Sequence, residues 1–385
     1  MKFNSFMAFL LFFVVFFRLS LFFPNLYLGF IPAVFGLIYF FRRLVTCLHN
    51  GELVMRRREA FLFSIFTIIF VYCVVFDLFQ TNKSFQALFT VRMIMLFVLS
   101  YIPAYYLVNK YLSRNEQLLE KIIVASLIIQ IIIFFVMFFS PEIKTILYTL
   151  FGMADSVNLW EQNAAVRGFG LSGEINFMTP FLMVYMAFFL IKRRYFLIAA
   201  ICLTQIVNSN MAVLAAVIGV CCARFNISIK VATALIIFIL VYSLGTVFFP
   251  RFYDEFVSGD GTRTLDILWE KHVFTVGAID WFSTIFGFQQ NISSSIPDLS
   301  VSSDMGWVIL FNYGGLLFII LYLLLISSLS IAAFGVTYVA AIWLMVGIIF
   351  NTKGLVLGSN GYFFISFIYI LLSRRRISTA KVSHD

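Results

Sequence analysis

The sequence predicts an all-α polytopic membrane protein with about 12 transmembrane helices and two large loops on the outer side of the membrane. Of the 385 residues, 62% are hydrophobic and 12% are charged, and the mean hydropathy is +1.00. So few polar side chains cannot cover a water-soluble globule. About a dozen apolar runs fill the chain, and most of them are long enough to cross roughly 30 Å of hydrocarbon. The bilayer therefore has to solvate most of this surface.

Each apolar run predicts one helix. The predicted helices cover residues 4–23, 26–41, 60–79, 84–108, 121–140, 174–191, 195–208, 210–224, 229–249, 305–327, 331–350 and 360–373. Two of them, 195–208 and 210–224, are short for a span, which needs roughly 17 to 25 residues. The junction Asn208-Ser209-Asn210 predicts either caps on two short spans or the turn of a re-entrant hairpin, which is tolerated where protein or water covers the broken backbone.

Basic residues cluster in alternate connections, and this predicts the orientation. The clusters are Arg42-Arg43, Arg56-Arg57-Arg58, Lys110 with Arg114 and Lys121, Lys192-Arg193-Arg194, Arg224 with Lys230, and Arg374-Arg375-Arg376. If the N-terminus is cytoplasmic, all of these clusters fall on the inner side and the C-terminus is cytoplasmic too. The net charge of +9 is therefore largely a topology signal and indicates no nucleic-acid partner.

We expect one integral membrane domain, residues 1–385, with its chemistry in two outer loops, residues 141–173 and 250–304. Long ordered loops tend to carry function, so substrate should meet the protein at the outer face. The five cysteines lie in predicted helices or on the inner side, where disulfides are not expected, and they show no metal-ligand spacing.

The end of the first loop predicts an anion site. Arg167 supplies a fixed cation, Gly168, Gly170 and Gly173 let backbone N–H groups approach a ligand, and a helix is expected to follow at Pro180. This combination suits a pyrophosphate. The alternative is that Arg167 contacts a lipid phosphate and the glycines are ordinary turn residues.

The second loop predicts an amphipathic surface helix from Thr262 to about Phe274. One face carries Leu265, Leu268, Trp269 and His272 at helical spacing. Lying on the membrane, such a helix would bring Arg263 and His272 close to lipid head groups. His272 is the histidine predicted on the outer face, and it is either a general base or a half-buried surface imidazole. The carboxylates that compete for the role of base are Asp254, Glu255, Asp260 and Asp304.

Two arginines, Arg18 and Arg92, lie inside predicted spans, where a charge is costly unless it is paired or reaches the interface. Arg92 is in the middle of its run, with Asp77 on the preceding helix as a possible partner. Either a structural ion pair or a substrate contact would explain it.

The end of the second loop carries a recognisable passage. Ile285-Phe286-Gly287-Phe288 is followed by a serine-rich stretch through Ser303, then by Asp304, and Asn312-Tyr313-Gly314-Gly315 lies near the start of a helix. This passage resembles the end of the large periplasmic loop in Wzy-type O-antigen polymerases and the related O-antigen ligases. The first loop resembles the same family's R-x-x-G-x-x-x-x-x-N run, with Arg167, Gly170 and Asn176 in the matching places. The layout of spans extends the resemblance over most of the chain, and motif identity is confined to about 165–180 and 260–317.

The resemblance implies a glycosyltransferase in a bacterial inner membrane that polymerises surface polysaccharide from undecaprenyl-pyrophosphate-linked repeat units, as in lipopolysaccharide biosynthesis. It implies that 141–173 and 250–304 are periplasmic loops, with Arg251 and Arg263 stabilising the leaving pyrophosphate and His272 or Asp304 accepting a proton. Substrate-binding residues would be Arg167, Gly170, Glu174, Asn176, Trp269 and Arg92. We expect no cofactor and no metal, since no D-x-D pair occurs in either loop. A flippase and a chain-length regulator are the protein partners implied.

One departure from the family concerns the base. Many relatives have a His-Asn pair where this chain has Ser303-Asp304, so the family's histidine does not carry over at that position. Two alternative functions stay open: an O-antigen ligase, which joins finished glycan to lipid A core, and a non-enzymatic flippase for lipid-linked oligosaccharides. The second long loop favours an enzyme over a flippase.

Overall fold

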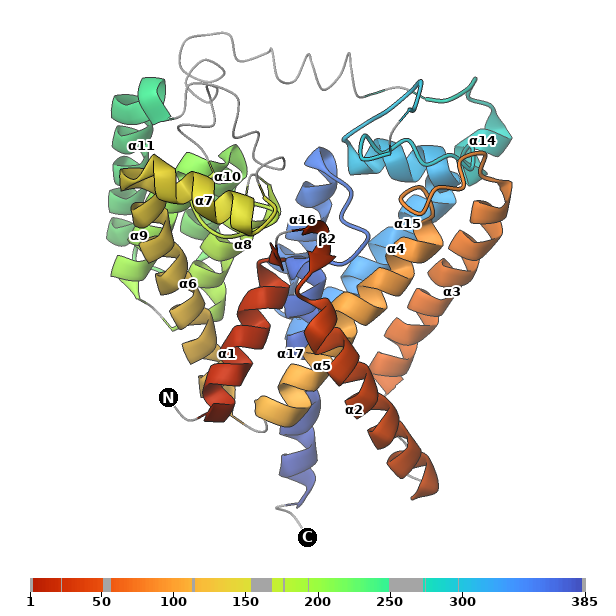
Figure 1. The fold of residues 1–385 in the computed structure, drawn as a ribbon, viewed down its shortest axis with the longest axis horizontal. Coiled ribbons are helices and arrows are strands. Elements are labelled where there is room, and N and C mark those ends of the chain that lie inside the picture. Colours follow the sequence, from red (N-terminus) through yellow and green to blue (C-terminus); the bar gives the residue numbers. More distant parts are fainter. Residues whose placement is uncertain are drawn as a thin grey trace. The chain divides into compact units, whose positions relative to one another are not determined.

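The computed structural model describes residues 3–21, 23–50, 57–112, 115–153, 168–175, 177–192, 194–248, 273, 275–296 and 298–382. These residues are mainly helical, and the strands among them are one short antiparallel pair, β1 (Ser20–Leu21) with β2 (Phe23–Tyr27) (Figure 1). The chain forms two compact units. Unit 1 comprises Met1–Pro32 and Asn109–Thr264, and unit 2 comprises Ala33–Val108 and Leu265–Asp385.

The described helices support a membrane-spanning protein. Within the described residues, five helical segments are long and apolar enough to cross a bilayer, namely Phe30–His49, Ala60–Phe79, Phe89–Tyr111, Glu116–Phe139 and Gly306–Phe334. Shorter apolar helices occupy six of the other seven predicted runs, and the 22-residue helix α11 (Ile227–Phe248) occupies the seventh. Each of the 12 predicted helices thus has an observed counterpart, whereas the number of spans and their orientation stay predictions.

In unit 1, most of the packing is centred on the helices α6 and α8. Its helices are α1 (Phe3–Phe16), α6 (Glu116–Phe139), α7 (Pro141–Leu150), α8 (Met178–Tyr185) continued by the π-helix η5 (Met186–Leu190), α9 (Tyr195–Asn208), α10 (Asn210–Cys222) and α11 (Ile227–Phe248). Helix α6 packs on α1, α7 and α9, and α8 packs on α9 and α10. Ser209 has an extended backbone and its hydroxyl accepts a hydrogen bond from the Met211 N–H, so the α9–α10 junction is a helix cap.

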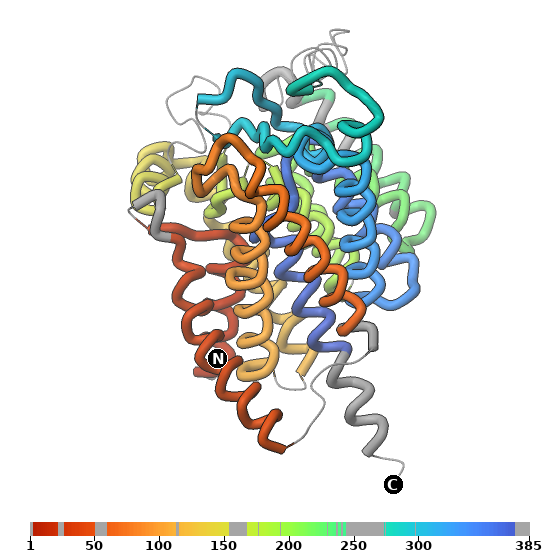
Figure 2. The backbone as a smooth tube through the Cα atoms, turned by 90° about the vertical axis from the view of Figure 1, so that its right-hand side faces the viewer, coloured from red at the N-terminus to blue at the C-terminus, as the bar shows by residue number. Residues whose placement is uncertain are grey.

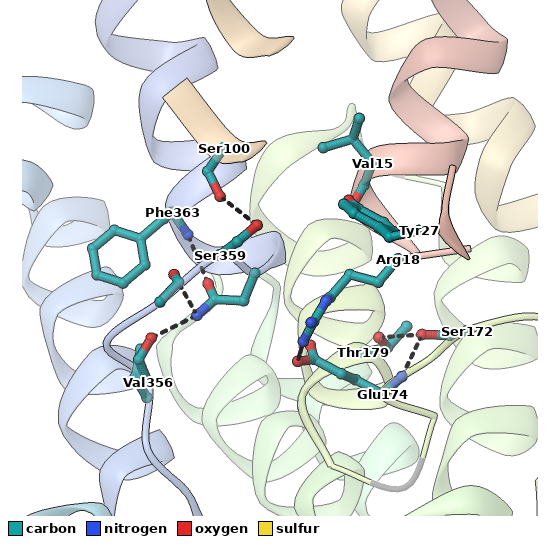
Figure 3. A network of polar contacts seen from close by, with 12 residues as sticks. Val15, Arg18, Tyr27, Ser100, Ser172, Glu174, Thr179, Val356, Ser359 and Phe363 are labelled. Atoms are coloured by element: carbon teal, nitrogen blue, oxygen red, sulfur yellow. Dashed lines mark hydrogen bonds and ion pairs between the residues drawn. The ribbon is translucent and has the colours of Figure 1, made fainter. Parts of the chain in front are cut away.

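Unit 2 is organised around a long bent helix, α15 (Gly306–Phe334), which packs on α3, α14, α16 and α17. The other helices are most of α2 (Phe30–His49), α3 (Arg57–Phe79), α4 (Phe89–Leu96), η1 (Phe97–Tyr101), α5 (Ile102–Tyr106), η2 (Leu107–Tyr111, which crosses the unit boundary), α14 (Trp281–Phe286), α16 (Tyr338–Lys353) and α17 (Gly361–Val382). Helices α4 to η2 run end to end. In the π-helix η1, the hydroxyl of Ser100 lies 3.2 Å from that of Ser359 (Figure 3).

Three features differ from the sequence-based expectation. The helix predicted at 4–23 ends at Phe16, and the strand β1 follows it. Residues 305–327 were predicted as one regular helix, but α15 bends at Gly314 (φ −141°, ψ 17°) and Gly315 (φ 63°, ψ −161°). The backbone of Gly315 lies in a region that is essentially restricted to glycine. The predicted loops also contain helices. Pro141 begins α7 after Ser140, and a reciprocal capping box between Asp280 and Ser283 begins α14.

The end of the second predicted loop, residues 275–304, is folded onto unit 2. In Figure 2 this segment (teal to blue) lies beside the α3–α4 connection (orange) at one end of the unit. Hydrogen bonds tie the two segments together, since the Asn291 N–H donates to the Gln80 side-chain oxygen over 2.8 Å and the Asn291 amide donates to the Ala87 carbonyl over 2.9 Å.

Candidate functional site

The predicted site residues divide between the two units and the undescribed parts of the chain. Outside the described residues lie Arg167, Asn176, Arg251, Arg263, Trp269 and His272. Unit 1 contains Gly170 and Glu174, and unit 2 contains Arg92 and Asp304.

In unit 1, the segment 168–175 is held by side chains that bond its backbone. The Asn208 amide accepts from the Phe169 N–H over 2.9 Å and donates to the Phe169 carbonyl over 2.7 Å. The Gln130 amide does the same for Leu171, at 3.0 and 2.7 Å. The two side-chain amides thus satisfy the backbone N–H and carbonyl groups of Phe169 and Leu171, which lie outside the described helices and strands.

Gly170, between these two residues, is also fully bonded. Its N–H donates to Met137 Sδ over 3.2 Å, and the Tyr148 hydroxyl donates to its carbonyl over 3.0 Å. With φ at 122° and a Cβ position only 2.9 Å from Gln130 Oε1, a side chain would not fit. The N–H that was predicted to approach a ligand is therefore used inside the protein, and Gly170 contributes to a fixed scaffold.

The residues that hold this scaffold, Gln130 and Asn208, were not among the site residues predicted from the sequence. Gln130 and Asn208 are each 1% exposed, and both lie in or at the end of apolar runs. A buried amide in a membrane helix needs hydrogen-bond partners, and that requirement marks such residues as candidates for a structural or functional role.

Glu174 pairs with Arg18, and Figure 3 shows the two side chains pointing toward one another. Arg18 was predicted inside a span, but α1 ends at Phe16, and Arg18 lies in the following turn with a φ of 51°. The Gly173 N–H donates to the Phe17 carbonyl over 3.0 Å, so backbone and side chain both join the end of α1 to the 168–175 segment. The pair explains how a charge from the first apolar run is accommodated.

Lys144 on α7 is 3% exposed, with its Nζ atom 4.3 Å from the centre of the Phe169 ring. Burial lowers the pKa of Lys144 from 10.5 to about 8. A buried ammonium one turn from Tyr148 thus borders the same scaffold, outside the helices long enough to span the membrane.

The lowered pKa of Lys144 predicts how stability depends on pH. Between about pH 8 and pH 10.5 the unfolded chain binds the proton and the folded chain releases it, so unfolding becomes less favourable as pH rises through this window. Lys144→Met removes the buried charge. We expect the variant to melt at a higher temperature than the wild type at pH 7, with the difference shrinking above about pH 8. Thermal unfolding of the purified wild type and variant across this pH range measures the difference in melting temperature.

The matched control is Lys121→Met, since Lys121 is exposed on α6. It should leave the melting temperature nearly unchanged at every pH. Equal effects of the two substitutions would contradict a burial penalty specific to Lys144.

In unit 2, Asp77 fixes the start of α4. One of its carboxylate oxygens accepts from the Tyr313 hydroxyl over 2.7 Å and from the Phe89 N–H over 3.3 Å, and the other accepts from the Thr90 N–H over 2.8 Å. Negative charge at a helix N-terminus is favourable because the first N–H groups have no partner inside the helix. Asp77, predicted as a partner for Arg92, thus bonds the helix that carries Arg92.

Arg92 lies in the first turn of α4 and reaches the end of the second loop. Its Nη2 atom is 3.4 Å from the Ser295 hydroxyl, and its guanidinium lies 5.9 Å from the centre of the Phe89 ring. The Ser295 hydroxyl in turn lies 2.8 Å from that of Ser293. The Arg92 side chain therefore contacts a polar surface near the N-terminus of α4.

Asp304 belongs to the same surface. It is exposed and accepts a hydrogen bond from the Ser294 hydroxyl. Residues 293 and 303 are bridged through their backbones, since the Ser303 N–H donates to the Ile292 carbonyl over 2.7 Å and the Ser294 N–H donates to the Ser303 carbonyl over 3.0 Å. We name Arg92, Ser293, Ser294, Ser295 and Asp304 the serine cluster.

The serine cluster combines three kinds of chemistry around three consecutive serines, with Arg92 bonded to Ser295 and Asp304 to Ser294. A guanidinium suits a phosphate oxygen, hydroxyls donate to anions or sugars, and a carboxylate can accept a proton. Within the described residues, no group of three or more His, Cys, Asp or Glu side chains is placed to hold a metal ion. The arrangement suits an anionic, hydroxyl-rich ligand.

In comparisons with protein-family models, curated proteins and solved structures, this chain matches none of them. The function proposed below therefore depends on the chemistry of the residues and on the resemblance of the motifs.

Proposed function

We propose that this protein is a polymerase of surface polysaccharide, of the O-antigen type, that joins lipid-pyrophosphate-linked repeat units at the outer face of a bacterial inner membrane. The observation that supports it is the serine cluster, in which Arg92 and Asp304 bond neighbouring residues of one ordered serine run. A ligand with both a pyrophosphate and sugar hydroxyls matches this set of groups.

The proposed reaction is a glycosyl transfer. A hydroxyl at the non-reducing end of one repeat unit attacks the anomeric carbon of the reducing sugar in the other chain. The new C–O bond forms as the bond to polyprenyl pyrophosphate breaks, and the leaving group takes the electron pair. The hydroxyl proton passes to a carboxylate or an imidazole. Asp304 is the candidate within the described residues, and His272 and the other outer carboxylates are the alternatives. Cations that meet the growing negative charge lower the barrier, and this is the role proposed for Arg167, Arg251 and Arg263.

The function is tested by deleting the gene in its native strain and restoring it on a plasmid, with the surface polysaccharide analysed on a gel. A polymerase leaves lipid A core capped by a single repeat unit when it is deleted. Bare core with long polymer accumulated on the lipid carrier would instead indicate a ligase. Bare core with unpolymerised precursor trapped inside the cell would indicate a flippase, and either of these results overturns the proposal.

The role of Asp304 gives a quantitative prediction. Asp304→Asn removes the proton acceptor and keeps a similar shape, so the rate of bond formation by purified protein on lipid-linked repeat units should fall by roughly 100-fold or more. Asp298→Asn is the matched control, because Asp298 is an exposed carboxylate in the same segment with a φ of 60°, which asparagine tolerates. An unchanged rate in Asp304→Asn would exclude Asp304 as the base and leave His272 and the other outer carboxylates as candidates.

A further inference from the structure

Helix α14 and the residues just before it expose a set of large apolar side chains. Trp281 is 73% exposed and Phe282 is 50% exposed, and Ile279 and Ile285 on either side are exposed as well. Water-soluble surfaces rarely carry such a contiguous group without a partner. These four residues are named the α14 apolar face.

The α14 apolar face is presented by a well-anchored element. The Asp280 and Ser283 side chains cap the helix reciprocally, and Gly287, with a φ of 70°, ends it. The Ile285 carbonyl packs on Gly315, where a Cβ would lie 2.4 Å from that oxygen. Because the segment is anchored in this way, the apolar side chains are exposed in its folded state.

The α14 apolar face lies at the end of two apolar stripes. Below the bend of α15, the exposed residues Leu316, Ile320 and Leu324 recur every four positions, and Leu316 directly follows the glycine that contacts Ile285. On α3, the exposed residues near the same end include Leu78 and Phe79. Both α3 and α15 are long and apolar enough to span a bilayer. In Figure 1, α14 lies at the flank of unit 2, beside the α3–α4 connection.

We infer that α14 is a membrane-interface anchor whose Trp281 and Phe282 side chains enter the head-group region of the outer leaflet. If α3 and α15 span the bilayer, their exposed apolar residues face lipid. The α14 apolar face then lies at the ends of these two stripes, at the boundary between the hydrocarbon and the head groups. Tryptophan favours this depth because its ring is apolar and its indole N–H can still reach water. The anchor would fix the end of the second loop relative to the bilayer, whatever reaction the protein catalyses.

The test uses the full-length protein reconstituted into phosphatidylcholine bilayers brominated either near the head groups or deep in the acyl chains. Bromine quenches tryptophan only at short range. The chain has five tryptophans, so the emission of Trp281 is obtained as the difference between the wild type and Trp281→Phe. We expect shallow bromine to reduce that emission by roughly half, deep bromine to reduce it less, and aqueous iodide to have little effect.

Trp343→Phe is the control, because Trp343 is fully buried in unit 2 and its difference emission should respond to none of these quenchers. Strong quenching of Trp281 by iodide with no effect of bromine would mean that the α14 apolar face is in water. Protection from every quencher would mean that protein covers it. Either result overturns the inference and leaves the proposed function unaffected, since no activity is measured.

Discussion

Gly315→Ala is expected to abolish accumulation of folded protein in the membrane. Gly315 has a φ of 63° and a ψ of −161°, and a Cβ there would lie 2.4 Å from the Ile285 carbonyl oxygen and 2.5 Å from the Gly287 nitrogen. Both neighbours are backbone atoms and cannot rotate away. The substitution therefore combines backbone strain of about 1–3 kcal/mol with a steric clash that separates α15 from residues 285–287. The yield of monodisperse protein on size-exclusion chromatography measures the effect.

Gly335→Ala separates the two contributions. Gly335 ends α15 with nearly the same backbone angles, φ 70° and ψ −172°, but nothing lies within 4 Å of its Cβ position. This variant carries only the backbone strain, so it should be recovered at reduced stability. If Gly315→Ala is recovered as well as Gly335→Ala, the contact between the bend of α15 and the end of α14 is less important than argued here.

Gln130→Leu is expected to destabilise unit 1 strongly. Leucine fills a similar volume but leaves the N–H and the carbonyl of Leu171 without their bonds to the Gln130 amide. Each buried backbone group left unpaired costs about 1–3 kcal/mol. For a unit of this size, the sum corresponds to a fall in melting temperature of roughly 5 °C or more. Thermal unfolding of the purified protein measures it.

Gln117→Leu is the matched control, since Gln117 is on the same helix, α6, but is exposed. It should leave the melting temperature within about 1 °C of the wild type, because surface substitutions away from special features usually change stability little. Equal falls in the two variants would show that the loss comes from the helix surface and not from the bonds to Leu171.

The resemblance identified the motif Asn312-Tyr313-Gly314-Gly315, but not what its residues do. In the structure, the Asn312 carbonyl accepts from the Phe288 N–H over 2.7 Å, and Tyr313 bonds Asp77. The Gly314 carbonyl accepts from the Tyr72 hydroxyl over 2.9 Å. The contacts of Tyr313 and Gly314 join residues more than 200 positions apart, so no local pattern in the sequence could predict them. The motif holds the end of the second loop on α3 and α15.

In the candidate site, too, the sequence predicts some of the residues but not their contacts. Arg92 could be selected from the sequence because a charge inside an apolar run is unusual. Asp304 could be selected because it lies in an outer loop where many of the resembling polymerases have a His-Asn pair. That both bond the serine run could not be predicted, since it depends on how residues 275–304 fold back onto α4. Gly170 was selected for its freedom to approach a ligand, whereas the surrounding side chains determine that its N–H is bonded to Met137.

The sequence by itself determined the class of this protein and the positions of its main helices, because apolar runs of bilayer length fold as helices wherever lipid replaces water. Each of the 12 predicted runs contains a helix, and within the described residues five helical segments are long and apolar enough to span. Only the tertiary structure decided the bend at Gly315, the short helices α7 and α14, and the partners of Gln130, Asn208, Asp77 and Arg18. Helix formation is a local response to composition, whereas the pairing of a buried polar group depends on which distant segment is packed against it.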